Sequence, residues 1–193
     1  MVLFRRANAA VAEMSDEALL AACGTGDLAA LDALFERFHL PLYRFISRLP
    51  TTDDGARDDL VQATFLEVRR SASGFRGSSS VKTWIFGVAA NLARHHLRGE
   101  RRRRASHASY AERVVAVPDR PDEQAERRQL LARTAKVVAS LPHDLQVTFI
   151  LCDLEEIPGV EVARALRIPE GTVWRRLHVA RKRIRSAITG DEP

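Results

Sequence analysis

Hydrophobic residues in this chain recur at intervals of three and four positions over most of its length. That spacing places them on one face of an α-helix, and no stretch shows a convincing alternation of the kind expected of an amphipathic strand. Helix-start signals precede two of the groups, because Ser15 stands before two carboxylates and Asp27 before a leucine-rich stretch. In the first half of the chain the pattern predicts helices over residues 15–22, 27–49, 56–72 and 81–104.

Glycine and proline indicate where these helices stop or bend. The first should end near Gly24 and Gly26, and Pro41 should kink the second because its ring clashes with the preceding turn. Residues 74–80, rich in glycine and serine, predict a loop. The helix that follows is apolar at its start and arginine-rich at its end, so we expect it to run from a core onto a charged surface.

The helical pattern weakens over residues 105–121, where small and polar residues lead to Pro118 and Pro121, and this composition predicts a flexible linker. The spacing then returns and predicts four more helices, over residues 122–139, 142–154, 157–167 and 170–187. The expected fold class is all-α, with two small helical domains. The predicted parts are an N-terminal extension (1–14), a first domain (15–104), the linker (105–121), a C-terminal domain (122–187) and a tail (188–193).

Positive charge is concentrated in two segments of a chain whose overall net charge is only +5. Residues 94–104 hold six arginines against one glutamate, and residues 170–185 hold six basic residues against one glutamate. Each segment therefore carries +5, and the remainder of the chain is acidic by the same amount. Two separate basic surfaces of this kind are typical of a protein that meets nucleic-acid phosphates in two places.

The remaining composition argues against several other classes of protein. No stretch approaches the roughly 18 apolar residues of a membrane-spanning helix, and the first 12 residues do not resemble a signal peptide, so we expect a cytoplasmic protein. Cys23 and Cys152 stand far apart, which predicts core residues rather than a disulfide framework or zinc site. The adjacent His95 and His96 would point in different directions on a helix, so we predict no metal and no cofactor.

The last two predicted helices have the pattern of a helix-turn-helix. Apolar residues form an inward face on both helices, and a compact turn at residues 168–171 separates them; the inward residues are Ile157, Val160, Ala163, Leu166, Val173, Leu177, Ala180 and Ile184. Arg175 and Arg176 would then face outward, near the front of the second helix, where a recognition helix meets base edges in the major groove. The alternative is a basic, solvent-exposed helix in a simple bundle.

Several segments can be compared with known sequences. The second helix of the pair carries IPEGTVWRRLHVARKRIR at residues 168–185. The first half carries DLVQATFL at residues 59–66 and FRGSSSVKTWIF at residues 75–86, which leads into NLARHHLR at residues 91–98. Together they resemble, in the right order over about residues 15–186, the bacterial sigma factors of the extracytoplasmic-function group.

The resemblance implies a DNA-binding role for residues in both domains. In that group the N-terminal domain binds core RNA polymerase and opens the minus-10 element, and the C-terminal domain reads the minus-35 element. The residues implied at the minus-10 element are Ser79, Ser80, Lys82, Asn91, Arg94, Arg98 and Arg101. Asn91 and the loop before it would accept a base turned out of the non-template strand, because an amide offers a donor and an acceptor to a base edge. The residues implied at the minus-35 element are Thr172, Trp174, Arg175, Arg176, His178, Arg181 and Lys182.

The resemblance also implies contacts with proteins. Asp59, Gln62, Phe65 and Leu66 would dock on a coiled coil of the largest polymerase subunit, with Phe65 as the apolar anchor. Without the family context, Phe65 would be taken for a core residue. An anti-sigma factor is the expected controller, and no small-molecule substrate or membrane insertion is expected.

This sequence departs from the family pattern at four positions. Ala63 stands where a glutamate is usual, Trp174 and Val179 where basic residues are frequent, and Arg167 where a glycine is common. If Arg167 is left-handed, its side chain costs on the order of 1–2 kcal/mol.

Two other functions compete with the sigma factor. A stand-alone helix-turn-helix regulator would need a ligand pocket or a symmetric apolar face in the first domain. A DNA-processing enzyme such as a recombinase would need a nucleophilic serine in a β-rich domain or a carboxylate cluster for metals. The helical first half indicates neither, so we predict no catalytic residues.

Overall fold

The computed structural model describes residue 11 and residues 13–49, 54–106 and 123–189; for residues 54, 100–106 and 123–131 it describes the backbone alone. Those residues form helices joined by turns and loops, as the all-α prediction requires. The predicted linker falls outside the described residues except for Ala105 and Ser106, which belong to a helix. Most of the predicted N-terminal extension and the end of the tail also lie outside them.

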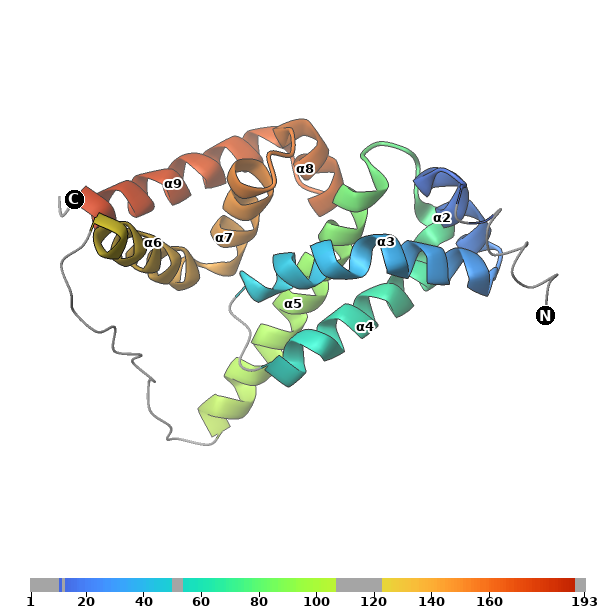
Figure 1. The fold of residues 1–193 in the computed structure, drawn as a ribbon, viewed down its shortest axis with the longest axis horizontal. Coiled ribbons are helices and arrows are strands. Elements are labelled where there is room, and N and C mark those ends of the chain that lie inside the picture. Colours follow the sequence, from blue (N-terminus) through green and yellow to red (C-terminus); the bar gives the residue numbers. More distant parts are fainter. Residues whose placement is uncertain (1–10, 12, 50–53, 107–122, 190–193) are drawn as a thin grey trace.

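Among the described residues, the N-terminal domain contains the helices α2 to α5 and one short 3-10 turn (Figure 1). They are α2 (Asp16–Gly24), α3 (Leu28–Ser47), α4 (Asp54–Ser71), the 3-10 turn Ala72–Gly74 and α5 (Val81–Ser106). The two predicted caps are present. The Ser15 hydroxyl accepts a hydrogen bond from the Ala18 amide at 3.2 Å, and the Asp27 carboxylate accepts from two amides of the first turn of α3. Helix α3 continues through Pro41.

The core of this domain lies where α3, α4 and α5 meet. Phe45 and Phe86 are fully buried and stack on each other, with ring centroids 4.7 Å apart. Leu60, Phe65 and Val68 of α4 are also buried. The apolar spacing therefore identified these inward positions, although Leu28 and Phe35 in the same pattern on α3 are 57% and 37% exposed.

The C-terminal domain contains α6 (Glu123–Ser140), α7 (His143–Phe149), α8 (Gly159–Leu166) and α9 (Glu170–Thr189). The predicted helix over 142–154 is not regular, because α7 widens into a π-helix over Ile150–Leu154. The chain then turns toward α8 through Glu156, which has a left-handed backbone with φ of 54°. Helical spacing cannot distinguish this widened turn from a continuous α-helix, because only the hydrogen-bond register changes.

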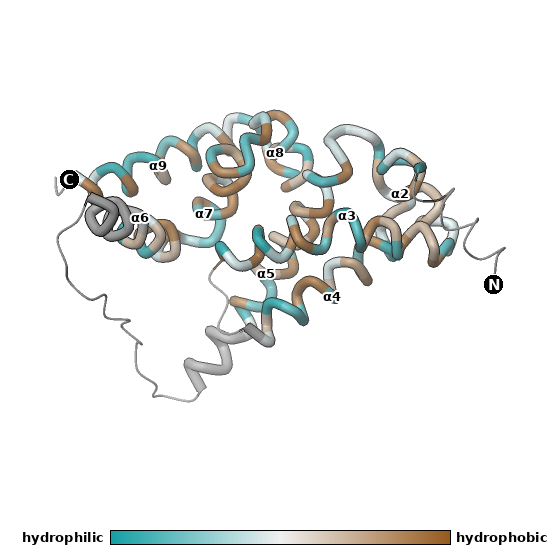
Figure 2. Tube along the Cα trace, viewed as in Figure 1, coloured by the Kyte–Doolittle hydropathy of each residue, from teal (hydrophilic) through white to brown (hydrophobic). Residues whose placement is uncertain are grey.

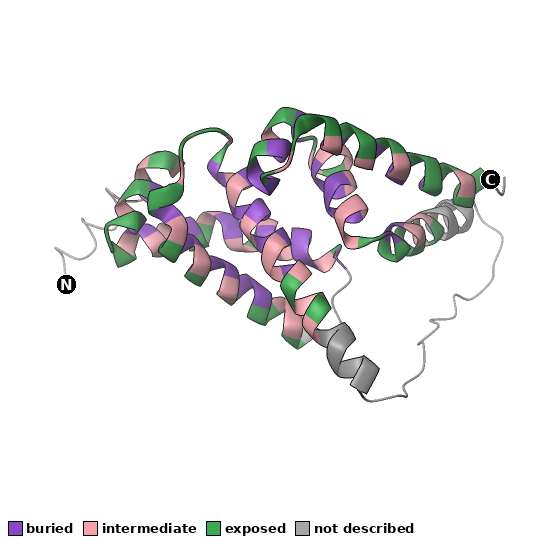
Figure 3. Cartoon of the chain, turned by 180° about the vertical axis from the view of Figure 1, so that it is seen from behind, coloured by how far each residue is buried: buried purple, intermediate pink, exposed green. Residues whose placement is uncertain are grey.

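One residue of the predicted inward face is wrong. Val160 is 37% exposed, and Val162 is fully buried in its place. Ile157 is buried, but it precedes the helix, which begins only after Pro158. The other two residues predicted on α8, Ala163 and Leu166, are buried, and so are the four residues predicted on α9. Figure 2 shows hydrophobic and hydrophilic residues alternating along α9, and Figure 3 shows the exposed outer side of that helix.

The two domains pack against each other through α5 and α8. Buried side chains of both domains share one hydrophobic cluster, which runs from Leu19 in α2 to Val173 in α9, while α6 and the later part of α9 form a second, smaller cluster. At the closest point Gly87 of α5 faces the backbone of α8, so a Cβ atom placed there would lie 2.6 Å from the carbonyl oxygen of Ala165. The fully buried Gln146 donates a hydrogen bond to the Arg48 carbonyl of the other domain at 2.8 Å. Within the described residues, no helix is long and apolar enough to cross a bilayer.

Candidate nucleic-acid interface

The residues predicted at the minus-35 element all lie on α9, which places them on a single helix. Trp174, Arg175, His178, Arg181 and Lys182 are exposed, while Thr172 and Arg176 are half-buried. The buried face of the same helix holds it against α7 and α8. The front of α9 is therefore presented to solvent on a rigid scaffold, as the recognition helix of a helix-turn-helix must be.

Two of these basic side chains are paired within the C-terminal domain. Arg181 donates two hydrogen bonds to the Asp153 carboxylate, at 2.9 and 2.5 Å. Arg176 forms an ion pair with Asp144 at 2.7 Å. Arg175 lies exposed at the front of the helix.

Trp174 occupies the entrance to the helix-turn-helix. Its ring covers Gly159 at the start of α8, where an added Cβ would meet the indole at 2.9 Å. Its ring nitrogen donates to the Glu170 carboxylate at 3.1 Å, one helical turn back. The side chain is 50% exposed, so it offers a fixed apolar edge beside Arg175.

In the turn before α9, Arg167 is left-handed, with φ of 54° and ψ of 46°, the conformation that the sequence had left open. The amides of Arg167 and Ile168 donate to carbonyls of the last turn of α8. The turn thereby closes the C-terminal end of α8 in the manner of a left-handed cap, although the residue is not glycine.

The residues predicted at the minus-10 element lie in the loop before α5 and along α5 itself. The Ser79 hydroxyl bonds locally to the Ser80 carbonyl. Arg98 is exposed, and Arg101 lies in the last turns of α5, whose side chains are outside the described residues. The other four residues contact or face the C-terminal domain.

Three of those four are held by carboxylates of the C-terminal domain. The Ser80 amide donates to Glu161 at 3.1 Å, and Lys82 forms an ion pair with Glu155 at 3.0 Å. Arg94 pairs with Asp144 at 2.9 Å. Sequence reasoning assigned no role to these carboxylates. The acidic remainder of the chain was a signal that they exist, but it did not indicate which basic residues they would meet.

Asn91 lines a cavity of about 230 Å³ between the domains. Trp84, Leu92 and His95 contribute to the wall from the same helix, and Ala165 and Arg167 line it from the C-terminal domain. Trp84 is half-buried and packs edge-on against Phe75, with ring centroids 5.6 Å apart. The amide therefore faces a space enclosed partly by aromatic and apolar groups.

The residues predicted to contact polymerase lie on α4, and they differ in exposure. Asp59, Gln62 and Leu66 are exposed, with Leu66 at 57%. Phe65 is only 5% exposed and packs against Phe35, so in this conformation it belongs to the core and is not available as an anchor. Apolar residues of α4 that are three or four positions apart share its inward face, which includes Phe65, and the next residue, Leu66, lies on the outward face.

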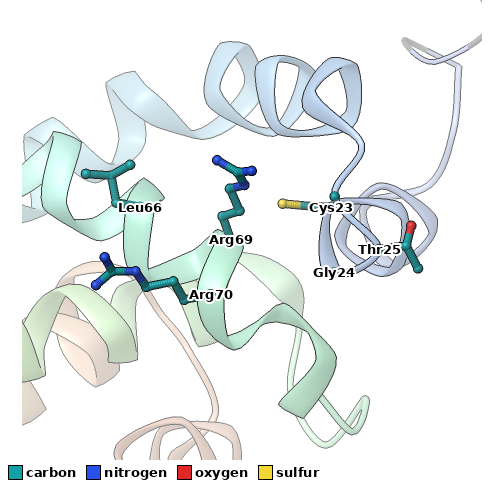
Figure 4. A pocket seen from close by; sticks show the side chains of 7 residues that line it. Cys23, Gly24, Thr25, Leu66, Arg69 and Arg70 are labelled. Carbon is teal, nitrogen blue, oxygen red and sulfur yellow. The ribbon is translucent and has the colours of Figure 1, made fainter.

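Leu66 borders an open cavity of about 490 Å³ beside the end of α2 (Figure 4). Arg69 and Arg70 of α4 and the turn at residues 23–26 form its other walls. Burial raises the pKa of the Cys23 thiol, which the nearby Arg69 opposes. Burial, with a contribution from Asp153, raises the pKa of Cys152 to about 11. Both cysteines therefore remain protonated near neutral pH. In the part of the chain that is described, no three metal-binding side chains converge.

The helix-turn-helix of α8 and α9 has an exposed arginine at the front of α9, and α5 is a further helix rich in basic residues. Together these features define a DNA-binding protein. Comparison with protein families identifies the two parts. Residues 34–103 match the family model for sigma-70 region 2, and residues 131–184 match the model for sigma-70 region 4. The chain belongs to the sigma-70 family, within its extracytoplasmic-function group, and is thus a sigma factor, which directs transcription initiation.

Curated relatives and solved structures agree with this assignment. The chain is 27% identical to the ECF RNA polymerase sigma-E factor of Haemophilus influenzae, over 91% of this chain and 96% of the relative. It is 28% identical to the sigma-E factor of Escherichia coli K12, over 89% and 93% respectively.

Two solved structures share the fold. CnrH, solved in complex with the cytosolic domain of CnrY, is 20% identical with a TM-score of 0.64, covering 92% of this chain and 99% of that one. The sigma factor RpoE of Bartonella quintana, solved with the anti-sigma factor NepR, is 20% identical with a TM-score of 0.61, covering 82% and 98%.

Proposed function

We propose that this sigma factor binds core RNA polymerase through α4, reads the minus-35 element with the front of α9, and opens the minus-10 element with the loop at residues 77–80 and α5. The observation that carries the proposal is the exposed front of α9, held behind a left-handed turn against a buried face. The N-terminal domain corresponds to residues 15–104 and the C-terminal domain to residues 122–187. The protein acts in the cytoplasm and performs no catalysis of its own.

At the minus-35 element, Arg175 is the principal reader and Trp174 supplies an apolar contact. The ion pairs of Arg176 and Arg181 with Asp144 and Asp153 leave Arg175 as the arginine best placed to reach a base edge. Trp174 is fixed by Gly159 and Glu170, and its exposed edge suits the methyl group of thymine.

At the minus-10 element, Asn91 reads a base turned out of the non-template strand, and Ser79, Ser80, Lys82, Arg94, Arg98 and Arg101 bind the strand around it. The wall beside Asn91 contains Trp84 and Leu92, which offer the apolar surface that an unstacked base needs.

At the polymerase, Leu66 replaces Phe65 as the apolar anchor, with Asp59 and Gln62 beside it. The adjoining cavity, with Arg69 and Arg70, extends this surface and would accept an acidic segment of the polymerase. By likeness to the two solved complexes, an anti-sigma factor controls the protein.

The test is run-off transcription with core RNA polymerase on promoter fragments that include the DNA upstream of its own gene. Arg175→Ala should reduce protein-dependent transcription by about 5- to 150-fold, the effect of losing roughly 1–3 kcal/mol of base recognition. Arg133→Ala removes the same charge from an exposed position on α6 and should leave transcription unchanged. Asn91→Ala should impair opening of the minus-10 element, measured by permanganate reactivity of unpaired thymines.

Polymerase binding is tested with a matched pair of variants. Leu66→Ala should weaken binding to core polymerase, whereas Leu40→Ala, at a leucine of α3 that is 55% exposed, should not. Equal binding by the wild type and both variants would remove α4 from the proposed interface. Absence of any protein-dependent transcript, together with no binding to core polymerase, would overturn the proposed function.

A further inference from the structure

The cavity that Asn91 lines contains four polar side chains that do not pair with one another. Besides Asn91, they are Glu67 of α4, His95 of α5 and Arg167 after α8. These four side chains form no hydrogen bond or ion pair with any residue that the structure describes. A carboxylate, an amide, an imidazole and a guanidinium therefore surround one cavity with their bonding capacity unused. A few convergent polar groups in an otherwise apolar pocket are typical of a small-molecule site.

The apolar part of the wall lies on one face of α5. Trp84, Val88 and Leu92 follow each other at intervals of four residues, and Asn91 and His95 belong to the same face. The three apolar side chains are half-buried, so each keeps surface that a ligand can cover. An indole with aliphatic neighbours suits a planar ring, because a ring can pack against them and keep its polar edge for the amide and the carboxylate.

The volume of the cavity limits the size of the ligand. It is about 230 Å³. An apolar cavity of roughly 150 Å³ admits benzene, whereas sites for drug-sized ligands span roughly 300–1,000 Å³. Two fused rings such as a purine therefore fit inside, and the ribose and phosphate of a nucleotide would lie toward solvent.

Arg167 gives an independent indication that the cavity has a ligand. It is one of the positions at which this sequence departs from the family pattern, and it holds a left-handed backbone, with φ of 54°, that disfavours a Cβ atom. Such strain is typical of residues whose side chain serves a function. The guanidinium is exposed and has no ion-pair partner within the described part of the chain, so it can bind an anionic group.

Glu67 and Asn91 distinguish among the bases. A carboxylate accepts hydrogen bonds and donates none, so it favours a ring edge with two adjacent donors. Guanine presents N1–H and its N2 amine side by side, whereas adenine presents one amine beside the acceptor N1. The amide of Asn91 can also donate to the acceptors O6 and N7 of guanine. The donor and acceptor groups of the cavity therefore fit guanine better than adenine.

We infer that this cavity binds a free guanine nucleotide, with the base between α4 and α5 and the phosphate on Arg167. The site takes residues from both domains, so it is complete in the arrangement of the domains seen here. The inference goes beyond the proposed function, which assigns Asn91 to promoter DNA and gives Glu67 and Arg167 no role.

Isothermal titration calorimetry with the full-length chain tests the inference, with guanosine monophosphate (GMP), adenosine monophosphate (AMP) and guanosine as ligands. GMP should bind, and AMP should bind at least about tenfold more weakly, because adenine leaves one oxygen of Glu67 without a donor. Guanosine should bind more weakly than GMP, because it has no phosphate for Arg167.

Two substitutions separate recognition of the base from recognition of the phosphate. Glu67→Gln offers one acceptor and one donor, as adenine requires, so it should reverse the preference and bind AMP more tightly than GMP. Arg167→Gly removes the cation and keeps the left-handed turn, so it should bind GMP only as tightly as guanosine. The matched controls Glu36→Gln and Arg133→Ala remove the same charges at exposed positions and should bind GMP as the wild type does. Circular dichroism verifies the helical content of each variant.

The absence of GMP binding at up to about 1 mM would overturn the inference, and so would equal binding of GMP and AMP. GMP binding that neither Glu67→Gln nor Arg167→Gly changes would also overturn it, because the nucleotide would then lie elsewhere. Run-off transcription tests the proposed function separately. A wild type that supports transcription but does not bind GMP retains the proposed function and loses this inference alone. GMP binding with the expected preferences, in a protein that neither binds polymerase nor supports transcription, would support the inference and overturn the proposed function.

Discussion

Arg167→Gly should raise the free energy of unfolding, although it removes a large side chain. Arg167 ends α8 with φ of 54° and ψ of 46°, inside the left-handed region where a Cβ atom crowds the following carbonyl oxygen. Glycine has no Cβ and adopts this conformation without that crowding. The backbone bonds that close the end of α8 use main-chain atoms, so they survive the substitution.

The expected gain is a difference between two terms. Relief of the left-handed strain contributes about 1–2 kcal/mol. The greater freedom of glycine in the unfolded chain costs about 0.5–1 kcal/mol. At the midpoints of these ranges the net gain is about 0.75 kcal/mol, equivalent to a rise of about 1.5–3 °C in Tm for a chain of this size.

Urea unfolding followed by circular dichroism measures this gain, with Arg167→Ala as the matched control. Alanine removes the same side-chain atoms beyond Cβ, including those that line the cavity around Asn91, but it keeps the strain. Arg167→Asn should fall between the two, because asparagine tolerates the left-handed region better than most residues. If alanine proves as stable as glycine at this position, the reasoning from backbone strain is refuted.

Three further outcomes can be measured on the same protein. Asp27→Ala removes the carboxylate that accepts from two amides at the start of α3, and it should lower the free energy of unfolding by about 1 kcal/mol; no change in the urea midpoint would contradict the capping role. Phe86→Ala leaves a void against Phe45 in the core and should cost about 3–5 kcal/mol, so that a loss below 1 kcal/mol would argue against the stacked arrangement. Because the pKa of Cys152 is raised from 9.0 to about 11, its alkylation by iodoacetamide at pH 8 should be about 100-fold slower in the folded protein than in urea, and similar rates in both would contradict its burial.

The sequence alone determined where most of the helices lie and most of their inward positions. Apolar spacing on α9, the caps at Ser15 and Asp27, and the turn before α9 depend on residues within about one or two helical turns of each other, so they can be read from local order. The resemblance to a known family added the assignment of surfaces. The errors also have local causes: Val160 was placed inward because Pro158 starts α8 later than the spacing implied, and the π-helix after α7 alters hydrogen bonding without altering composition.

What only the tertiary structure decided is which of the predicted functional residues are accessible. Phe65 is buried by Phe35, while its neighbour Leu66 is exposed. Lys82 and Arg94 meet Glu155 and Asp144, partners that lie on the other domain, and the Arg48–Glu155 pair spans 107 positions of sequence. Such pairings follow from how α5 and α8 pack, and that packing depends on shape at one close contact beside Gly87 as much as on charge. Local spacing specifies which face of a helix is apolar, whereas the choice among several possible carboxylate partners requires the complete three-dimensional arrangement.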